Sequence, residues 1–349
     1  MITILGAGGS VSDELVKLLA ASGKAFRLVS RSGTKAAGAA ETVAADLGDK
    51  EQTARAVAGS SVVLLLAGLK YDHKLWAEMW PPIMTNTIEA CKRAGAKLVF
   101  FDNVYMYGRV RGAMTEETPF HPTSKKGEVR AKIALDLINE WKGGALTAMI
   151  ARAADFYGPG AKNGIPNVLV FEPMSKGQTP MCLASDVLPH SYTYVPDSAR
   201  ALMTLIESER AWNQTWHVPT TANPPTAREF IEMAAKEMER PAKYRVLSRG
   251  MVRVFGWFRP VVGEVREMMY QNDSPYLFDS TKFARAFGSL GPPMRKGSAR
   301  RRSRIRAVHR GQFTVHSGQG SVVSGHWSSG TYCRDTVAQF PALPPTHTL

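Results

Sequence analysis

The sequence is poor in cysteine and contains no long apolar run. Its three cysteines, Cys91, Cys182 and Cys333, have neither the spacing of a metal site nor the number that a disulfide framework needs. The longest apolar run, residues 60–68, has the length of a strand, whereas about 18 residues are needed to cross a bilayer. Met1 stands directly before the first strand pattern, which leaves no room for a secretory signal. We therefore expect a cytoplasmic protein that binds neither a membrane nor a metal ion.

The positive charge is unevenly distributed. The chain has a net charge of +14, and residues 291–349 hold nine Lys or Arg side chains against one Asp, which is +8 of that total. A basic excess is typical of nucleic-acid binding, but this segment is rich in Arg, Ser and Gly and has no regular period. We expect a disordered tail or the product of a reading-frame shift near Gly291. A natural basic arm that binds nucleic acid is the alternative.

Strand-like and helix-like segments alternate through the first half of the chain. Strands are expected within residues 1–9, 25–33, 61–68, 96–108 and 146–160. Helices are expected within residues 13–22, 49–59, 81–95 and 127–144. This alternation predicts an α/β fold with a Rossmann-type doubly wound parallel sheet.

The second half is more mixed and predicts a smaller α/β lobe. A strand and a helix are expected within residues 191–208, and an amphipathic helix begins after Thr226. Residues 251–270 are apolar and aromatic and are expected to form core or lid helices over a substrate cleft. Three parts follow: a nucleotide-binding domain over residues 1–160 with its last strands continuing to about 220, a mainly substrate-binding lobe over 161–290, and the tail over 291–349.

A glycine-rich turn follows the first expected strand. The stretch GAGGSVS places Gly6, Gly8, Gly9 and Ser12 between a strand and a helix. Glycine lets the backbone turn sharply and approach a pyrophosphate, and a helix N-terminus supplies amide donors and partial positive charge. The turn therefore predicts a dinucleotide site, although the same glycines would also suit an ordinary turn.

The second expected strand ends in the stretch VSRSG. Sites that prefer NAD usually place a carboxylate here for the ribose hydroxyls, but this chain has Ser30 and Arg31. A hydroxyl and a guanidinium suit the 2′-phosphate of NADP. We expect NADP to be preferred over NAD, unless Arg31 is only a solvated loop charge.

Over residues 1–290 the chain resembles the extended short-chain dehydrogenases/reductases, the NAD(P)-dependent epimerase/dehydratase-like proteins. The resemblance rests on the glycine loop, on AADLGD, LLLAG, NVYMYG and RAADFYGPG, and on two later segments, YTYVPDSARAL and FDSTKFARAFG. It implies that Asp46 and Leu47 lie beside the adenine and that Ala67 and Gly68 lie near the ribose. It also places the stretch that contains Phe156 on the nicotinamide and substrate side.

The resemblance also implies a catalytic serine, tyrosine and lysine, and this chain departs at all three positions. An ungapped comparison places Asn103 at the serine, Lys126 at the tyrosine and Arg130 at the lysine. Asn103 can still bind through its amide group, and Arg130 can hold a ribose or phosphate but cannot release its proton. The standard mechanism therefore cannot operate unchanged.

Two residues are candidates for the missing acid–base group. Lys126 is the first, because a like charge and desolvation would lower the pKa of a lysine beside Arg130 in a cleft. The alternative is that Lys126 and Arg130 are solvated charges at the start of a helix. Tyr105 is the second candidate, because alternation along a strand would place it on the same face as Asn103.

These features predict an NAD(P)-dependent oxidoreductase or epimerase/dehydratase-type enzyme. Hydride transfer would act on a small hydroxylated or carbonyl substrate, and the acid–base residues would be atypical. The alternative is an NADP-binding sensor or regulatory protein without catalysis. The resemblance also implies a possible homodimer, paired through helices near residues 83–92 and 127–138.

Overall fold

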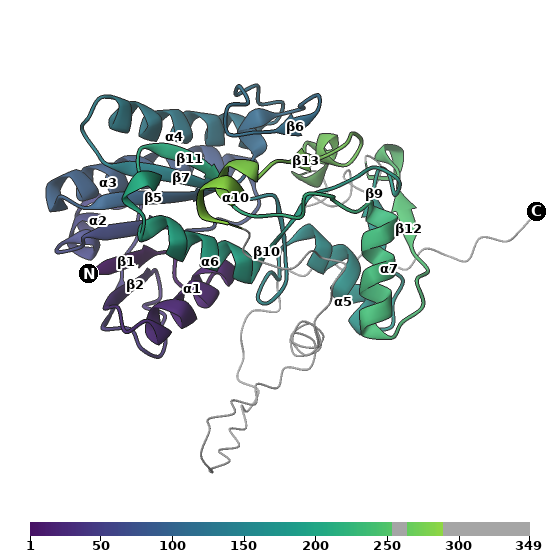
Figure 1. Cartoon of the computed structure of the whole chain (residues 1–349), viewed down its shortest axis with the longest axis horizontal. Helices are drawn as coiled ribbons and strands as arrows, with labels where there is room; N and C mark the ends of the chain where they lie inside the picture. The colour runs from purple at the N-terminus through teal and green to yellow at the C-terminus, as the bar shows by residue number, and fades with distance from the viewer. Residues whose placement is uncertain (253–263, 289–349) are drawn as a thin grey trace, which may run out of the picture. The chain divides into compact units, whose positions relative to one another are not determined.

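The computed structural model describes residues 1–252 and 264–288, which fall in a compact unit spanning residues 1–311. Its centre is a seven-stranded sheet, in which every pairing is parallel. The strands are β1 (Ile2–Leu5), β2 (Phe26–Ser30), β3 (Glu41–Ala44), β4 (Val62–Leu65), β5 (Lys97–Asp102), β7 (Ala148–Arg152) and β11 (Gln214–His217). Their order is β11-β7-β5-β4-β1-β2-β3, so the chain adds strands on one side of β1 as far as β3 and on the other side from β4 onward. Figure 1 labels β1, β2, β5, β7 and β11 of this sheet. The order is that of the expected doubly wound Rossmann-type sheet, and ligands of such sheets bind at the carboxyl ends of the strands near the point where the strand order reverses.

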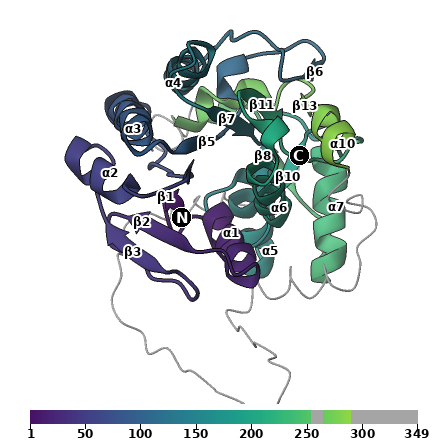
Figure 2. The ribbon, with the colours of Figure 1, turned by 60° about the vertical axis from the view of Figure 1, so that its left-hand side comes forward.

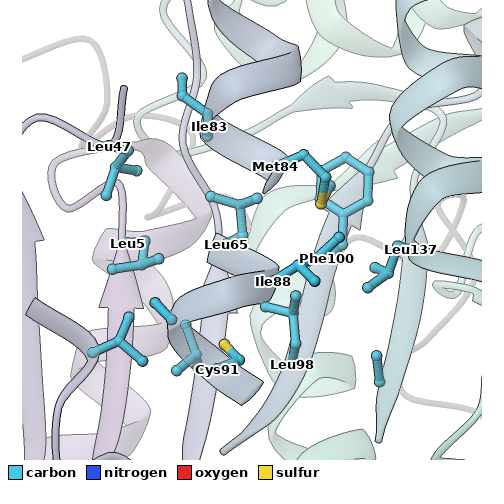
Figure 3. Packing of buried hydrophobic residues seen from close by; sticks show 14 of the residues in the cluster. Leu5, Leu47, Leu65, Ile83, Met84, Ile88, Cys91, Leu98, Phe100 and Leu137 are labelled. Atoms are coloured by element: carbon cyan, nitrogen blue, oxygen red, sulfur yellow. The ribbon is translucent and has the colours of Figure 1, made fainter. Parts of the chain in front are cut away.

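Helices cover both faces of the sheet (Figure 2). On one face, α1 (Ser10–Ala21) packs against α6 (Val195–Ile206). On the other face lie α2 (Lys50–Val57), α3 (His73–Ala94) and α4 (Lys125–Lys142). Figure 3 shows the core under α3, where the helix lies over the side chains of the central strands. Its labelled residues include Ile83, Met84, Ile88 and Cys91 of the helix and Leu5, Leu65, Leu98 and Phe100 of the strands.

Helix α3 begins earlier than the sequence suggested. The expected start was Pro81, but the helix begins at His73, where the Asp72 side chain accepts hydrogen bonds from the backbone N–H groups of Lys74 and Leu75. Pro81 and its neighbour therefore lie inside the helix. Prolines remove helical hydrogen bonds, so the burial of the apolar face of α3 must stabilise this segment against its low propensity.

The chain after β5 is a turn, and the expected strand over residues 96–108 is therefore too long. Strand β5 ends at Asp102, and Tyr105–Tyr107 form a single 3₁₀ turn that closes at Gly108 with φ of +65°. The prediction that Asn103 and Tyr105 alternate along one strand face is wrong. Strand β3 was not predicted, and β11 was expected only in general terms, among the last strands continuing to about residue 220. Their sequences, ETVA and QTWH, contain no continuous apolar run.

Three small parallel pairs, separate from the main sheet, organise the second half. They are β8 (Asp155–Tyr157) with β10 (Tyr192–Tyr194), β9 (Met181–Leu183) with β12 (Arg245–Leu247), and β6 (Ala113–Met114) with β13 (Leu277–Phe278). Helix α7 (Ala227–Met238) starts with a capping box between Thr226 and Glu229, as its sequence predicted. The described residues also include the helices α5 (Glu172–Ser175) and α10 (Thr281–Phe287).

In the described parts of the chain, no helix is long and apolar enough to cross a membrane. The tail over residues 291–349 lies outside the described residues, as does most of the segment expected to form lid helices.

A buried chain of hydrogen bonds ties the last described segment to the sheet. The Arg152 guanidinium donates to the Tyr107 hydroxyl at 2.7 Å, and Nε2 of His217 lies 2.8 Å from that hydroxyl. Nδ1 of His217 lies 2.7 Å from the Asp279 carbonyl oxygen and so donates to it. Burial, with the Arg152 charge, lowers the pKa of His217 to about 3. The imidazole is therefore neutral in the folded protein at neutral pH.

We predict that His217 makes stability fall in mild acid. The unfolded chain takes up this proton below a pH of about 6.5 and the folded chain only near pH 3. The stabilisation is therefore complete above pH 6.5 and is lost progressively as the pH falls toward 3. Between pH 6.5 and 5 the group contributes a loss of about 2 kcal/mol. Urea unfolding of the wild type and of His217→Asn at both pH values measures it. Equal losses in both proteins would contradict the assignment.

Candidate active site

The glycine-rich turn has the geometry that a pyrophosphate requires. Gly6 has φ of +105°, and a Cβ built on it would lie 2.5 Å from the Cα of Ala67, so only glycine fits between the ends of β1 and β4. Gly8 also has positive φ, +90°. Gly9 is the N-cap of α1 and provides no side-chain cap. The first turn of α1 therefore presents its amide groups and partial positive charge to a ligand.

Two further observations fit an anionic group at this helix start. The Ser12 hydroxyl is buried and has no hydrogen-bond partner among the described residues. The loop after β8 comes close, because a Cβ on Gly160 would lie 3.2 Å from the Cβ of Ser10. The two loops thus lie against each other at the start of α1, where the amide groups of the first turn and the unpaired Ser12 hydroxyl suit the pyrophosphate of a dinucleotide.

The end of β2 forms a hydroxyl-rich turn beside the glycine loop. The backbone N–H of Thr34 donates to the Ser30 hydroxyl at 2.8 Å, and the two hydroxyls lie 3.0 Å apart. A Cβ on Gly8 would lie 3.8 Å from the Thr34 side chain. Arg31 is exposed and forms no ion pair within the described residues. The turn therefore places a hydroxyl pair and an unpaired guanidinium next to the glycine loop.

The residues expected along the adenosine and ribose lie after the carboxyl ends of two strands of the sheet, β3 and β4. The Asp46 carboxylate accepts the backbone N–H of Gly48 at 2.9 Å, while the Leu47 side chain is buried in the core. Asn86 of α3 holds this turn by donating to the Leu47 and Gly48 carbonyls. Ala67 and Gly68 follow β4 directly. Their expected contacts with a nucleotide remain predictions.

Phe156 lies in β8, close to the carboxyl end of β5. Its ring stacks on Phe101 with the centroids 5.7 Å apart. The ring is partly exposed, so one side is free to contact a ligand. Its role toward the nicotinamide remains a prediction.

Lys126 is fully buried, at 0% exposure, which overturns the interpretation of this residue as a solvated charge. Its ammonium forms ion pairs with the carboxylates of Glu264 and Glu267, and the Glu267 pair measures 2.5 Å. It also lies 4.3 Å above the centre of the Tyr71 ring. The ammonium therefore contacts two carboxylates from a segment almost 140 residues away, and these partners were not predicted.

Both carboxylates also cap helix starts. Glu264 accepts the backbone N–H of His73, the first residue of α3, at 3.1 Å, and its other oxygen lies 2.7 Å from the imidazole. Glu267 accepts the backbone N–H of Lys125, the first residue of α4, at 3.1 Å. A negative charge at a helix N-terminus is favourable. Lys126 and the first residues of α3 and α4 thus all bind the segment 264–267. We call these contacts of Glu264 and Glu267 with Lys126, His73 and Lys125 the Lys126 anchor.

Asp72, His73 and Glu264 place their potential ligand atoms within 4.8 Å of one another. Each carboxylate already has a partner, because Asp72 caps α3 and Glu264 binds both His73 and Lys126. The expectation of no metal site remains a prediction.

Arg130 is also buried, with 4% of its surface exposed, so its interpretation as a solvated charge is wrong. Its Nε and Nη2 lie 2.7 Å and 2.6 Å from one oxygen of Asp102, at the end of β5. The guanidinium stacks over Trp80 at 4.3 Å and over Phe100 at 4.8 Å. Arg152 approaches the second Asp102 oxygen at 3.7 Å. Arg130 therefore fixes α4 to the sheet. Its expected contact with the ribose or phosphate of the cofactor remains a prediction.

Asn103 and Tyr105 lie in the turn between β5 and α4. The Asn103 side chain accepts the backbone N–H of Tyr105 at 3.0 Å, and the Tyr105 ring stacks on Trp76. Helix α4 starts against this turn, since a Cβ on Gly127 would lie 2.6 Å from the Tyr105 carbonyl oxygen. Burial, and then the Asp155 carboxylate, raise the pKa of Tyr105. Its phenol is therefore protonated at neutral pH.

Asp155 has a cluster of tyrosines around it that sequence reasoning missed. Burial is the largest cause of a raised pKa in each of these phenols, and the Asp155 carboxylate raises it further. They are Tyr71, Tyr105, Tyr192, Tyr270 and Tyr276. Asp155 lies 2.9 Å from Nε2 of His190, whose ring stacks on Tyr276 at 4.3 Å. The only signal in the sequence was Asp155 in the stretch RAADFYGPG.

Asp155 and His190 also line a pocket in the second half of the chain. Its other walls are mostly apolar and come from β9, β10, α7 and the turn before α5, with Leu169, Leu183 and Phe230 among them. A largely apolar pocket with a few convergent polar groups is typical of a small-molecule site. Of the five phenols, Tyr192 lines the pocket together with Asp155 and His190. We call this pocket, with the buried phenols, the carboxylate and the imidazole around it, the cleft.

Comparison with known proteins decides the family. The sequence model of the NAD dependent epimerase/dehydratase family matches residues 2–218. The chain belongs to this family. Membership confirms the expected resemblance, and with it the expected class: an NAD(P)-dependent enzyme of epimerase/dehydratase type. No protein with curated annotation matches the sequence significantly.

Solved structures of the same fold are similar at low sequence identity. UDP-glucose 4-epimerase of Thermus thermophilus, in complex with NAD, has a TM-score of 0.61 and 22% identity, covering 70% of this chain and 85% of that one. The dTDP-glucose 4,6-dehydratase DesIV of Streptomyces venezuelae, with NAD and TYD bound, has a TM-score of 0.69 and 17% identity, covering 88% of this chain and 97% of that one. WbmH of Bordetella bronchiseptica, in complex with NAD⁺, has a TM-score of 0.66 and 15% identity, covering 88% of this chain and 96% of that one. These similarities confirm the fold.

We predict that the Asp102 carboxylate is essential for stability. Asp102→Ala would leave Arg130 and Arg152 buried without their carboxylate, at an expected loss of about 3–5 kcal/mol in the free energy of unfolding. Asp136→Ala is the matched control on α4, because it removes only an exposed ion pair with Lys132, worth less than about 1 kcal/mol. Chemical denaturation measures both. If both variants lose a similar amount of unfolding free energy, the buried ion pairs of Asp102 stabilise the protein no more than an exposed pair does.

Proposed function

We propose that this protein is an NADP-preferring enzyme that transfers hydride to and from a small hydroxylated or carbonyl substrate. The observation that carries the preference is the turn at the end of β2. There Ser30 and Thr34 offer hydroxyls and Arg31 an exposed guanidinium, with no carboxylate among them. A guanidinium can bind a 2′-phosphate through charge-assisted hydrogen bonds, whereas a carboxylate would repel it.

The proposed substrate is a sugar nucleotide or a similar polyhydroxyl compound. The similar structures named above include a UDP-glucose 4-epimerase and a dTDP-glucose 4,6-dehydratase. The cleft beside Asp155 supports the same class, because phenols, a carboxylate and an imidazole can all hydrogen-bond to hydroxyls. The apolar pocket beside it would receive a less polar part of the ligand.

The proposed acid–base chemistry uses phenols. Lys126 is held in ion pairs with two carboxylates of its own chain, so its ammonium is already engaged and is poorly placed to exchange a proton with a substrate. The tyrosines of the cleft have raised pKa values and stay protonated, Tyr105 among them. A protonated phenol donates a proton to an oxygen that gains charge as hydride reaches the adjacent carbon. Asn103 would orient that oxygen through its amide.

Cofactor titration tests this proposal. Purified protein is titrated with NADPH and with NADH while nicotinamide fluorescence is followed, for the wild type and for Arg31→Ala. We expect NADPH to bind more tightly than NADH, and Arg31→Ala to weaken NADPH about tenfold or more, which corresponds to about 1.4 kcal/mol, with NADH little changed.

Lys24→Ala is the matched control, because it removes an exposed positive charge before β2. Equal affinity for both nucleotides, unaffected by Arg31→Ala, would contradict the NADP preference. The absence of binding by either nucleotide would contradict the cofactor site itself.

A further inference from the structure

The cleft contains several phenols, and their hydroxyls differ in what they contact. Those of Tyr71 and Tyr105 lie close to each other, since each phenol affects the pKa of the other. Those of Tyr270 and Tyr276 are buried and make no hydrogen bond of normal geometry among the described residues, although the Ser124 hydroxyl lies close to that of Tyr270. A buried hydroxyl without a partner costs about 1–3 kcal/mol. Such a group is therefore a candidate for contact with a ligand.

Tyr270 is the one that lies on the Lys126 anchor. Glu267, whose carboxylate binds both Lys126 and the first amide of α4, precedes Tyr270 by three residues. The backbone between them is helical, with hydrogen bonds from Met268 to Val265 and from Gln271 to Met268. Residues three apart on such a turn share a face. The side chain of Tyr270 therefore follows that of Glu267 toward the start of α4.

The surroundings of Tyr270 agree with this placement. Burial and the neighbouring Tyr105 phenol raise the pKa of Tyr270, the Ser124 hydroxyl lowers it, and Asp155 and Glu267 raise it. Ser124 is the N-cap of α4 and Tyr105 lies in the turn that precedes this helix. Tyr270 thus lies at the carboxyl ends of β5 and β7, beside the position where the resemblance places the missing tyrosine.

We propose that Tyr270 is the catalytic phenol of this enzyme and that Lys126 is the positioning residue that holds it in the cleft. The proposal rests on the proposed function. As hydride from the reduced nicotinamide adds to a substrate carbonyl carbon, the π pair of the carbonyl moves to oxygen. That oxygen takes the proton of the Tyr270 hydroxyl, and the phenolate regains a proton from solvent. In this proposal Tyr270, from a distant segment, takes over the role of the family's tyrosine. Lys126, which stands at the position of that tyrosine, holds the segment through its ion pairs with Glu264 and Glu267.

Fluorine NMR tests the assignment without a known substrate. The full chain is labelled with 3-fluorotyrosine, and the Tyr270 and Tyr276 resonances are identified by their loss in Tyr270→Phe and Tyr276→Phe. A proton donor to the reacting carbonyl must lie close to the nicotinamide ring. We therefore expect NADPH to shift the Tyr270 resonance. Tyr276 is the matched control, because its hydroxyl is equally buried and unpaired while its ring stacks on His190.

Lys126→Met separates positioning from general damage to the fold. It removes the ammonium and keeps an apolar side chain of similar length. We expect the variant to bind NADPH with little change in affinity and to lose the NADPH-induced shift of Tyr270. A variant that keeps the shift would overturn the role of Lys126. Lys132→Met, on the exposed side of the same helix, should behave as the wild type.

The outcomes also separate this assignment from the proposed function. NADPH binding that moves Tyr276 or no tyrosine, and leaves Tyr270 unchanged, would overturn the role of Tyr270 while the cofactor site stands. If NADPH fails to bind, the proposed function falls and the role of Tyr270 falls with it. NADPH binding with a shifted Tyr270 resonance supports both.

Discussion

The ion pairs of the buried Lys126 hold this candidate active site together. An ammonium removed from water costs several kcal/mol unless carboxylates and hydrogen bonds compensate. Here two carboxylates do so, and each also caps the start of a helix that ends over the sheet. The late segment 264–271 is thereby fixed to α3 and α4, and Tyr270 is carried into the cleft.

The second constraint is the electrostatic state of the cleft. The Asp155 carboxylate lies against the imidazole of His190, and several phenols lie near it. Negative charge and burial together keep these phenols protonated. The family's tyrosine needs a nearby lysine to lower its pKa, and here Arg130 is instead tied to Asp102 under Trp80. The phenols of the cleft are therefore neutral, and one of them gives up its proton only when a strongly basic alkoxide forms beside it.

Much of the fold was predictable from local pattern. The buried strands β1, β2, β4, β5 and β7 and the helices between them have strong periods, so the doubly wound sheet followed from the sequence alone. The start of α3 was predicted wrongly, because the Asp72 cap lies well before the first proline and tertiary burial overrides the propensity of Pro81. Short strands such as β11 have too few residues for a period to appear.

The cofactor turn and the departures at Asn103, Lys126 and Arg130 were visible in the sequence, but their contacts were not. Lys126 looked like a solvated charge because its neighbours along the chain are polar. Its burial depends on Glu264 and Glu267, which no short-range pattern connects to it. The same holds for Asp155 and Tyr270, which approach each other only in the folded chain. Polar contacts between segments far apart in the sequence are therefore the feature of this site that could not be predicted from the sequence.

Hydrogen–deuterium exchange tests the Lys126 anchor most directly. Exchange of residues 264–271 and of the first turns of α3 and α4 is compared among the wild type, Lys126→Met and Lys132→Met. We predict markedly faster exchange in these segments for Lys126→Met alone, while the amides of β4 and β5 keep their protection. If residues 264–271 exchange equally slowly in all three proteins, Lys126 does not hold the segment and the central claim is wrong.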